Sequence, residues 1–142
     1  RDRDGYLAFL SLNPQVLAVC TDWQVRPGPE GPVVNDHADP ERDAEVLDRL
    51  RRLHAEVVPV TDRLGAALGR LGGYGDRLGA ALDRVLAGDT GWLTRPTIDS
   101  YHTVWFELHE DLLATLGRSR TDEPRRAADP GVVPGGVTEE YA

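Results

Sequence analysis

The sequence predicts an all-α protein, because two stretches have helical periodicity and none has the periodicity of a strand. Apolar residues recur at heptad spacing between residues 47 and 71, in two neighbouring lines along one helix. From residue 98 to 116, apolar side chains fall within about 160° of arc when successive residues are set ~100° apart. No apolar–polar alternation persists anywhere in the chain. We therefore expect a helical bundle built around one long helix.

Composition limits the domain count and the classes of partner. The 142 residues suit one domain, and the formal net charge of −8 argues against a nucleic-acid backbone or an anionic membrane as partner. No apolar run approaches the ~18 residues of a membrane-spanning helix. Cys20 is the single cysteine, which excludes an internal disulfide and a cysteine-rich zinc site. With no signal-peptide pattern in the sequence, we expect a cytoplasmic protein.

Both ends of the single domain, residues 1–142, raise questions. The chain contains no methionine, so we expect it to be incomplete at the N-terminus or processed. From about residue 118 the apolar content is too low for independent folding, which predicts a flexible, solvated segment. A lid closing over a pocket is the functional alternative for this segment.

Taken in order, the first elements are short helices, a loop and a long helix. Residues 6–25 are apolar and interrupted by Pro14, so they predict two short helices. Residues 26–39 are rich in proline and glycine and predict a loop. The long helix should then begin with Asp39 as N-cap and Pro40 in its first turn.

The two heptad lines define the long helix. They continue across Pro59, which predicts one kinked helix ended by Gly72 and Gly73. One line comprises Leu47, His54, Thr61 and Leu68, and the other comprises Leu50, Val57, Leu64 and Leu71.

Two further helices follow. Residues 75–86 predict a helix whose segment DRLGAAL repeats residues 62–68, with small residues that permit close packing. Thr97 is then expected to cap a histidine-bearing helix that ends at Gly117.

The histidine-bearing helix is the most informative part of the sequence. His102 and His109 both lie inside its apolar arc, where each imidazole needs a partner for its polar nitrogens. Seven residues separate them, or roughly 10 Å along the axis. Two ligands on one helix bind a small metal ion at one-turn spacing, so this pair does not form such a site.

A lone axial ligand to haem is compatible with the pattern. His109 would ligate the iron, and His102 would reach a cofactor edge or propionate. The apolar wall around His109 would consist of Trp105, Phe106, Leu112 and Leu113. The alternative is that both imidazoles are hydrogen-bonded core residues.

The other two histidines suggest less. His54 occupies a core heptad position, where a satisfied core residue is favoured over a polar pocket group. His37 lies in a loop and is expected to be solvated.

Residues 99–117, DSYHTVWFELHEDLLATLG, resemble the haem-ligand helix of the tryptophan 2,3-dioxygenase superfamily. Among its members, the bacterial haem-dependent tyrosine hydroxylases of natural-product biosynthesis are the most similar. An aromatic residue one turn before the ligand histidine and a glycine at the helix end carry the resemblance, at Trp105, His109 and Gly117. A family loop, Gly-Thr-Gly-Gly-Ser, is replaced here by DPGVVPGG.

The resemblance implies an iron-containing haem b oxygenase. Such an enzyme would hydroxylate a tyrosine-like aromatic amino acid with oxygen or peroxide. His109 would bind the iron, while Trp105, His102, Phe106 and Leu113 would contact the cofactor. The substrate carboxylate would be bound by an arginine, for which ordinary surface charge is the alternative role. The candidates are Arg118, Arg120, Arg125 and Arg126.

Two other classes of function remain open. A non-catalytic helical binding or regulatory module would explain the heptads and the small residues without any cofactor. A non-haem metal enzyme would require His54 and His37 to converge with one histidine of the helix. The heptad lines are also compatible with a homo-oligomer.

Overall fold

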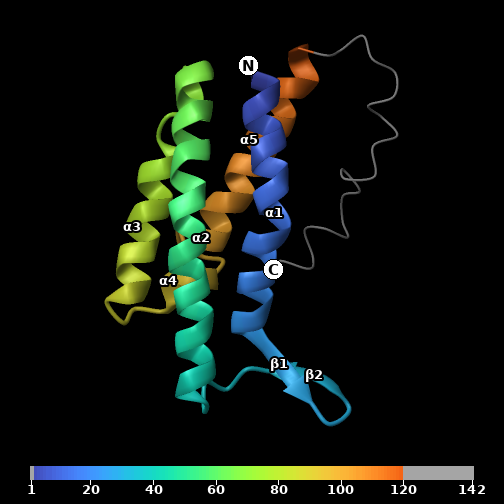
Figure 1. The fold of residues 1–142 in the computed structure, drawn as a ribbon, viewed down its shortest axis with the longest axis vertical. Helices are drawn as coiled ribbons and strands as arrows, with labels where there is room; N and C mark the ends of the chain where they lie inside the picture. Colours follow the sequence, from blue (N-terminus) through green and yellow to red (C-terminus); the bar gives the residue numbers. More distant parts are fainter. Residues whose placement is uncertain (1, 120–142) are drawn as a thin grey trace.

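The protein is a four-helix bundle. A computed structural model describes residues 2–119 of the chain, so the C-terminal segment expected to be flexible lies almost wholly outside the described residues. The long helices are α1 (Asp2–Gln24), α2 (Pro40–Ala67), α3 (Tyr74–Leu86) and α5 (Tyr101–Ser119). They run alternately down and up, and α1 packs on α2, α2 on α3, α3 on α5 and α5 on α1 (Figure 1). The all-α prediction is confirmed, and none of the described helices is long and apolar enough to cross a membrane.

Helix α1 is continuous, so the prediction of two short helices in residues 6–25 was wrong. Pro14 lies inside the helix and is exposed. Its ring removes the hydrogen bond that would reach the carbonyl of Leu10. Leu10 is 36% exposed and Pro14 is exposed as well, so this turn of α1 lies at the surface of the bundle, where water is available to replace the lost partner.

Helix α2 begins as the sequence predicts. The Asp39 carboxylate accepts hydrogen bonds from the backbone N–H groups of Glu41 and Arg42, and Pro40 occupies the first turn. The helix passes through Pro59 without a break, which confirms one long element. It ends at Ala67 rather than at Gly72, because a 3₁₀ turn, η1 (Gly69–Leu71), forms before the glycines.

The two heptad lines that begin in α2 differ in how far their side chains are buried. The line of Leu50, Val57, Leu64 and Leu71 is buried throughout, with each side chain at most 1% exposed. In the other line, Thr61 is buried, whereas Leu47, His54 and Leu68 are half-buried. The first line therefore forms the core of the bundle, and the second lies at its margin.

A hairpin connects α1 to α2 where the sequence predicts a loop. Strand β1 (Val25–Gly28) pairs antiparallel with β2 (Gly31–Val34), with Val25 opposite Val34 and Gly28 opposite Gly31. Gly31 has a φ of +121°, which an L side chain rarely adopts, so glycine is needed to close the turn. Strand β1 is mostly half-buried and β2 is mostly exposed, and neither has a buried face, which explains why no alternating pattern reveals them.

The second half of the chain brings α5 back into the bundle. After α3, a short helix, α4 (Gly91–Thr94), leads into α5. Ser100, rather than the expected Thr97, caps α5, because its hydroxyl accepts a hydrogen bond from the backbone N–H of Thr103. The helix extends to Ser119, two residues beyond the expected end at Gly117.

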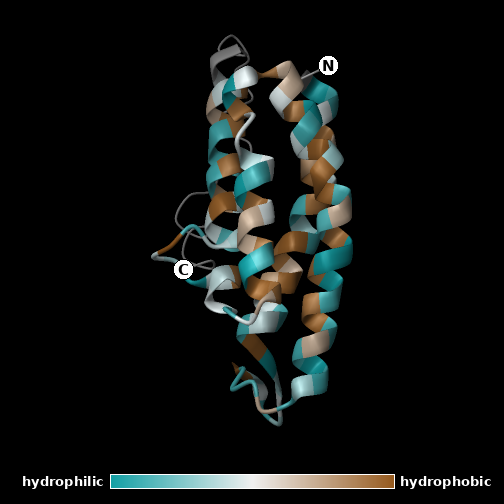
Figure 2. Cartoon of the chain, turned by 90° about the vertical axis from the view of Figure 1, so that its left-hand side faces the viewer, coloured by the Kyte–Doolittle hydropathy of each residue, from teal (hydrophilic) through white to brown (hydrophobic). Residues whose placement is uncertain are grey.

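Polar contacts fix α3 against α5 at the surface. Arg77 forms two hydrogen bonds with the Glu107 carboxylate, at 2.9 and 3.2 Å, and these hold the pKa of Glu107 below its usual value. The Tyr74 hydroxyl donates to Asp111 at 2.9 Å. Hydrophobic and hydrophilic residues alternate in short groups along the helices (Figure 2), as expected of amphipathic helices in a bundle.

The repeated segment offers a matched test of helix packing. Gly65 and Gly79 occupy equivalent positions in the two copies of DRLGAAL. A Cβ at Gly65 would lie 2.9 Å from the Cα of Gly72, whereas at Gly79 the nearest atom would be His54 Nε2 at 3.8 Å. We expect Gly65→Ala to lower the free energy of unfolding by about 1–3 kcal/mol, because backbone must move.

Gly79→Ala should instead raise the free energy of unfolding by about 0.5–1 kcal/mol, because alanine is the better helix former. Urea unfolding followed by circular dichroism measures both. Equal effects of the two substitutions would contradict the close approach of Gly65 to Gly72.

Candidate functional site

The apolar arc of α5 is divided between the interior of the bundle and its flank. Tyr101, Trp105, Leu108 and Leu112 are at most 1% exposed, and His102 is 5% exposed. Three predicted site residues are only half-buried: Phe106, His109 and Leu113. Since these three are spaced by three and four positions, they share one side of the helix.

Trp105 is fully engaged by α1. Its ring stacks on Phe9 with centroids 4.4 Å apart and planes 18° apart. Its indole N–H donates to the side-chain oxygen of Asn13 at 2.8 Å. One face and the polar edge of this indole therefore have partners from α1, and with Trp105 only 1% exposed the ring has no free surface for a cofactor.

His109 also faces α1. Its ring lies 5.3 Å from the ring of Phe9, at 42° to it. Burial lowers the pKa of His109, and the nearby Glu110 carboxylate only partly opposes this. Burial likewise lowers the pKa of His102. Both imidazoles are therefore predominantly neutral at pH 7.

Residues 2–119 of a single copy do not enclose a haem around His109. Trp105 and His102, assigned to the haem contact, are sealed within the bundle, and Phe9 packs against the ring of His109. Only Phe106, His109 and Leu113 are left on the flank, on one side of any bound group. Within residues 2–119, no three His, Cys, Asp or Glu side chains are grouped so that they could hold a metal ion.

His54 forms a polar contact near the core with α5. Its Nδ1 lies 2.8 Å from the Tyr101 hydroxyl, and the two rings meet edge to face. Burial lowers the pKa of His54, against a weaker opposing effect of Asp83 on α3. Tyr101 is fully buried, so its hydroxyl requires such a partner. This agrees with the sequence interpretation of His54 as a satisfied residue, but His54 is half-buried at the margin of the bundle rather than in its core.

His37 belongs to a network that fastens the hairpin to α2. Its Nδ1 lies 2.8 Å from an Asp43 oxygen, and its ring packs against Trp23 at 4.5 Å. The backbone N–H of His37 donates to the side chain of Asn35, whose amide donates to the carbonyl of Trp23. His37 is therefore a structural residue with its side chain 42% exposed, rather than merely a solvated one, and it does not converge with His54.

Sequence periodicity missed the outward side of α1. Leu7, Leu10, Pro14 and Leu17, here called the α1 stripe, follow one another at spacings of three and four residues. Leu7 is 51% exposed, Leu10 is 36% exposed and Leu17 is half-buried. The helix therefore has an apolar inner face and a second apolar face in contact with solvent.

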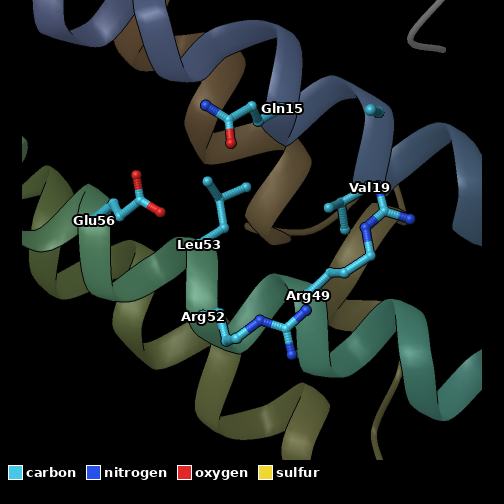
Figure 3. A pocket seen from close by; sticks show the side chains of 7 residues that line it. Gln15, Val19, Arg49, Arg52, Leu53 and Glu56 are labelled. Carbon is cyan, nitrogen blue, oxygen red and sulfur yellow. The ribbon is translucent and has the colours of Figure 1, made fainter.

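The sequence also gave no sign of a groove between α1 and α2. This α1–α2 groove has a volume of about 270 Å³. Figure 3 shows Glu56 on one side of Leu53 and Arg49 on the other, with Gln15 reaching in from α1. The groove is lined by Gln15, Ala18, Val19, Arg49, Arg52, Leu53 and Glu56.

Comparison of the chain with models of protein families, with curated proteins and with solved structures gives no match. The resemblance of residues 99–117 to a haem-ligand helix therefore stays a prediction from the sequence pattern. The arginines proposed to bind a substrate carboxylate, at positions 118, 120, 125 and 126, have side chains outside the described part of the chain.

One buried and two half-buried histidines predict that the fold is weakened by acid. The pKa values of His54, His102 and His109 are lower in the folded protein than the ~6.5 of an unfolded chain. The unfolded state therefore binds more protons below about pH 7, and the free energy of unfolding falls as the pH falls. The slope is at most about 1.4 kcal/mol per pH unit for each histidine.

Urea unfolding at pH 7.5, 6.5 and 5.5, a range above the titration of most carboxylates, measures this slope. The double variant His102→Leu/His109→Leu should show a clearly shallower dependence on pH than the wild type. An unchanged slope would show that burial of these two imidazoles does not control the acid sensitivity.

Proposed function

We propose that the chain is a non-catalytic helical module that pairs with a second copy of itself along the α1 stripe. The observation that carries this proposal is an exposed helix face without charge. Residues 5–21 contain no Asp, Glu, Lys or Arg, although 28% of the whole chain is charged. At that average, these 17 residues would carry about five charges.

Exposure makes the lack of charge informative. A helix that is uncharged because it is buried on all sides needs no further partner. Here Leu7 and Leu10 are exposed, and so are Ser11 and Pro14 between and beside them. Contiguous exposed apolar residues on a soluble protein mark an interaction surface.

The spacing of the α1 stripe favours a helix as the occupant. Steps of three and four residues form a straight seam along a helix, which is the pattern by which two helices interdigitate. Ser11 and Ala18 flank the stripe, and their small side chains allow a second helix to approach closely.

A second copy of α1 satisfies these requirements best. The stripe is centred near residue 12, so an antiparallel pair places Leu7 against Leu17 of the partner subunit and Leu10 against Pro14 of the partner subunit. This arrangement is closed by a two-fold axis, the commonest symmetry of oligomers. With a net charge of −8, two copies repel one another generally, and the uncharged face is where they approach at least cost.

Leu10→Arg should abolish the dimer. The two-fold axis applies the substitution twice, and each buried leucine contributes about 1.5–3 kcal/mol, so we expect the dissociation constant to rise at least about 100-fold. Leu86→Arg is the matched control, since Leu86 on α3 is 44% exposed. Sedimentation equilibrium over a range of concentrations measures the association, and circular dichroism verifies the fold of each variant.

A cysteine introduced beside the α1 stripe gives an independent readout of dimer formation. Cys20 is 2% exposed, and burial raises its pKa to about 12, so the native thiol contributes little background. Ser11→Cys should form an intermolecular disulfide rapidly, whereas Ala55→Cys on the exposed side of α2 should not. A wild-type protein that stays monomeric at high concentration, with equal cross-linking of both variants, would overturn the proposal.

A haem-dependent aromatic oxygenase is the second candidate function. It is favoured by the flank of α5, where the half-buried His109 lies between Phe106 and Leu113. Because the described residues of a single copy cover only one side of a group bound there, this function requires a second surface over the flank. A partner subunit or a segment outside the described residues would have to supply it.

Absorption spectra with and without added haemin test this candidate. A Soret band that forms with the wild type and with His37→Ala, but not with His109→Ala, would support haem ligation by His109. The His37 variant controls for adventitious ligation by an accessible histidine. No band after reconstitution, or a band that persists in His109→Ala, would contradict it.

A further inference from the structure

The two ends of the α1–α2 groove carry opposite charge. At one end, Arg49 donates to Asp22 at 2.7 Å, while Arg51 and Arg52 both pair with Asp48. Asp48 is therefore shared by two arginines, of which only Arg52 lines the groove. Because one carboxylate does not fully neutralise two guanidinium groups, Arg52 can still attract an anionic group.

The other end of the groove presents acceptors. Among the side chains that the structure describes, none forms an ion pair with Glu56. The amide nitrogen of Gln15 donates to the carbonyl of Ser11, and its oxygen is turned toward Leu53 (Figure 3). A carboxylate and an amide oxygen together suit a cationic donor such as an ammonium group.

Between these ends the groove has an apolar floor. Val19 and Leu53 form it, and each is at most 6% exposed as a residue. Arg52 and Glu56 are four residues apart on α2, and Arg49 and Glu56 are seven apart, which corresponds to roughly 6–10 Å along the helix. The volume of about 270 Å³ lies just below the ~300–1,000 Å³ of most ligand pockets, so it suits a small molecule.

We propose that the α1–α2 groove binds a small ω-amino acid, a molecule with a carboxylate and an ammonium group at opposite ends of an apolar chain. The carboxylate pairs with Arg49 and Arg52, the ammonium group with Glu56 and the Gln15 oxygen, and the methylene chain lies on Leu53. Recognition depends on both charges at the proper separation, so a molecule with only one of them binds more weakly.

Titration of ¹⁵N-labelled full chain with 6-aminohexanoate, followed by NMR chemical shifts, tests the proposal. We expect saturable shifts at backbone amides of residues 15–19 and 49–56, with a dissociation constant in the millimolar range. Hexanoate and hexylamine, which each keep one charge, should bind about fivefold more weakly. Glycylglycine keeps both charges without the apolar chain, and it should also bind more weakly.

Two variants test which end of the groove binds the carboxylate of the ligand and which end binds its ammonium group. Glu56→Gln should weaken the binding of 6-aminohexanoate about fivefold and leave the binding of hexanoate unchanged. Arg52→Gln should weaken the binding of 6-aminohexanoate and of hexanoate, and leave the binding of hexylamine unchanged. Glu110→Gln on α5 is the matched control and should change nothing. Absence of saturable shifts in the groove, or equal binding of 6-aminohexanoate and its one-charged analogues, would overturn the proposal.

Discussion

Closure of the bundle depends on the contact between α1 and α5. Helices α2, α3 and α5 follow one another in space, and α1 completes the ring only by packing on α5 as well as on α2. The Phe9–Trp105 stack provides the apolar part of this contact. The hydrogen bond from Trp105 to Asn13 satisfies the one polar atom of the indole. The side chain is therefore fully buried without the energetic cost of an unpaired polar group.

This contact also determines which side chains of the histidine-bearing helix α5 are buried and which remain accessible. Once α1 covers Trp105, the apolar arc of α5 is divided, with His102 inside and His109 at the edge beside Phe9. Because α1 uses one face against α5 and another against α2, its third face is left to solvent. The α1 stripe and the half-exposed flank of α5 are therefore consequences of the same closure.

The sequence predicts those features that depend on neighbours along the chain. The Asp39 cap, the first turn at Pro40 and the buried line from Leu50 to Leu64 all follow from spacing within one helix. Pro14 misleads, because proline removes one backbone hydrogen bond and crowds the preceding turn without always ending a helix, and here that turn lies at the exposed surface of the bundle.

The candidate sites depend on contacts between distant residues, which periodicity does not reveal. Trp105 and Asn13 are 92 positions apart, and His54 and Tyr101 are 47 apart. A helical wheel places Trp105 correctly on an apolar face, but it does not tell whether a cofactor or another helix covers that face. The α1–α2 groove is likewise invisible, since its lining residues are ordinary members of two amphipathic helices.

Helix α1 has three faces with different roles: one contacts α5, one contacts α2, and one carries the α1 stripe. These three roles restrict which mutations the helix can accept. Loss of a single residue would rotate everything beyond it by ~100°, turning Phe9 away from α5 and moving the stripe off its face. Deletion of Pro29 or Glu30 would instead change only the hairpin turn. Variation in length should therefore accumulate in the connections, while α1 keeps its length and changes only by substitutions that satisfy all three faces.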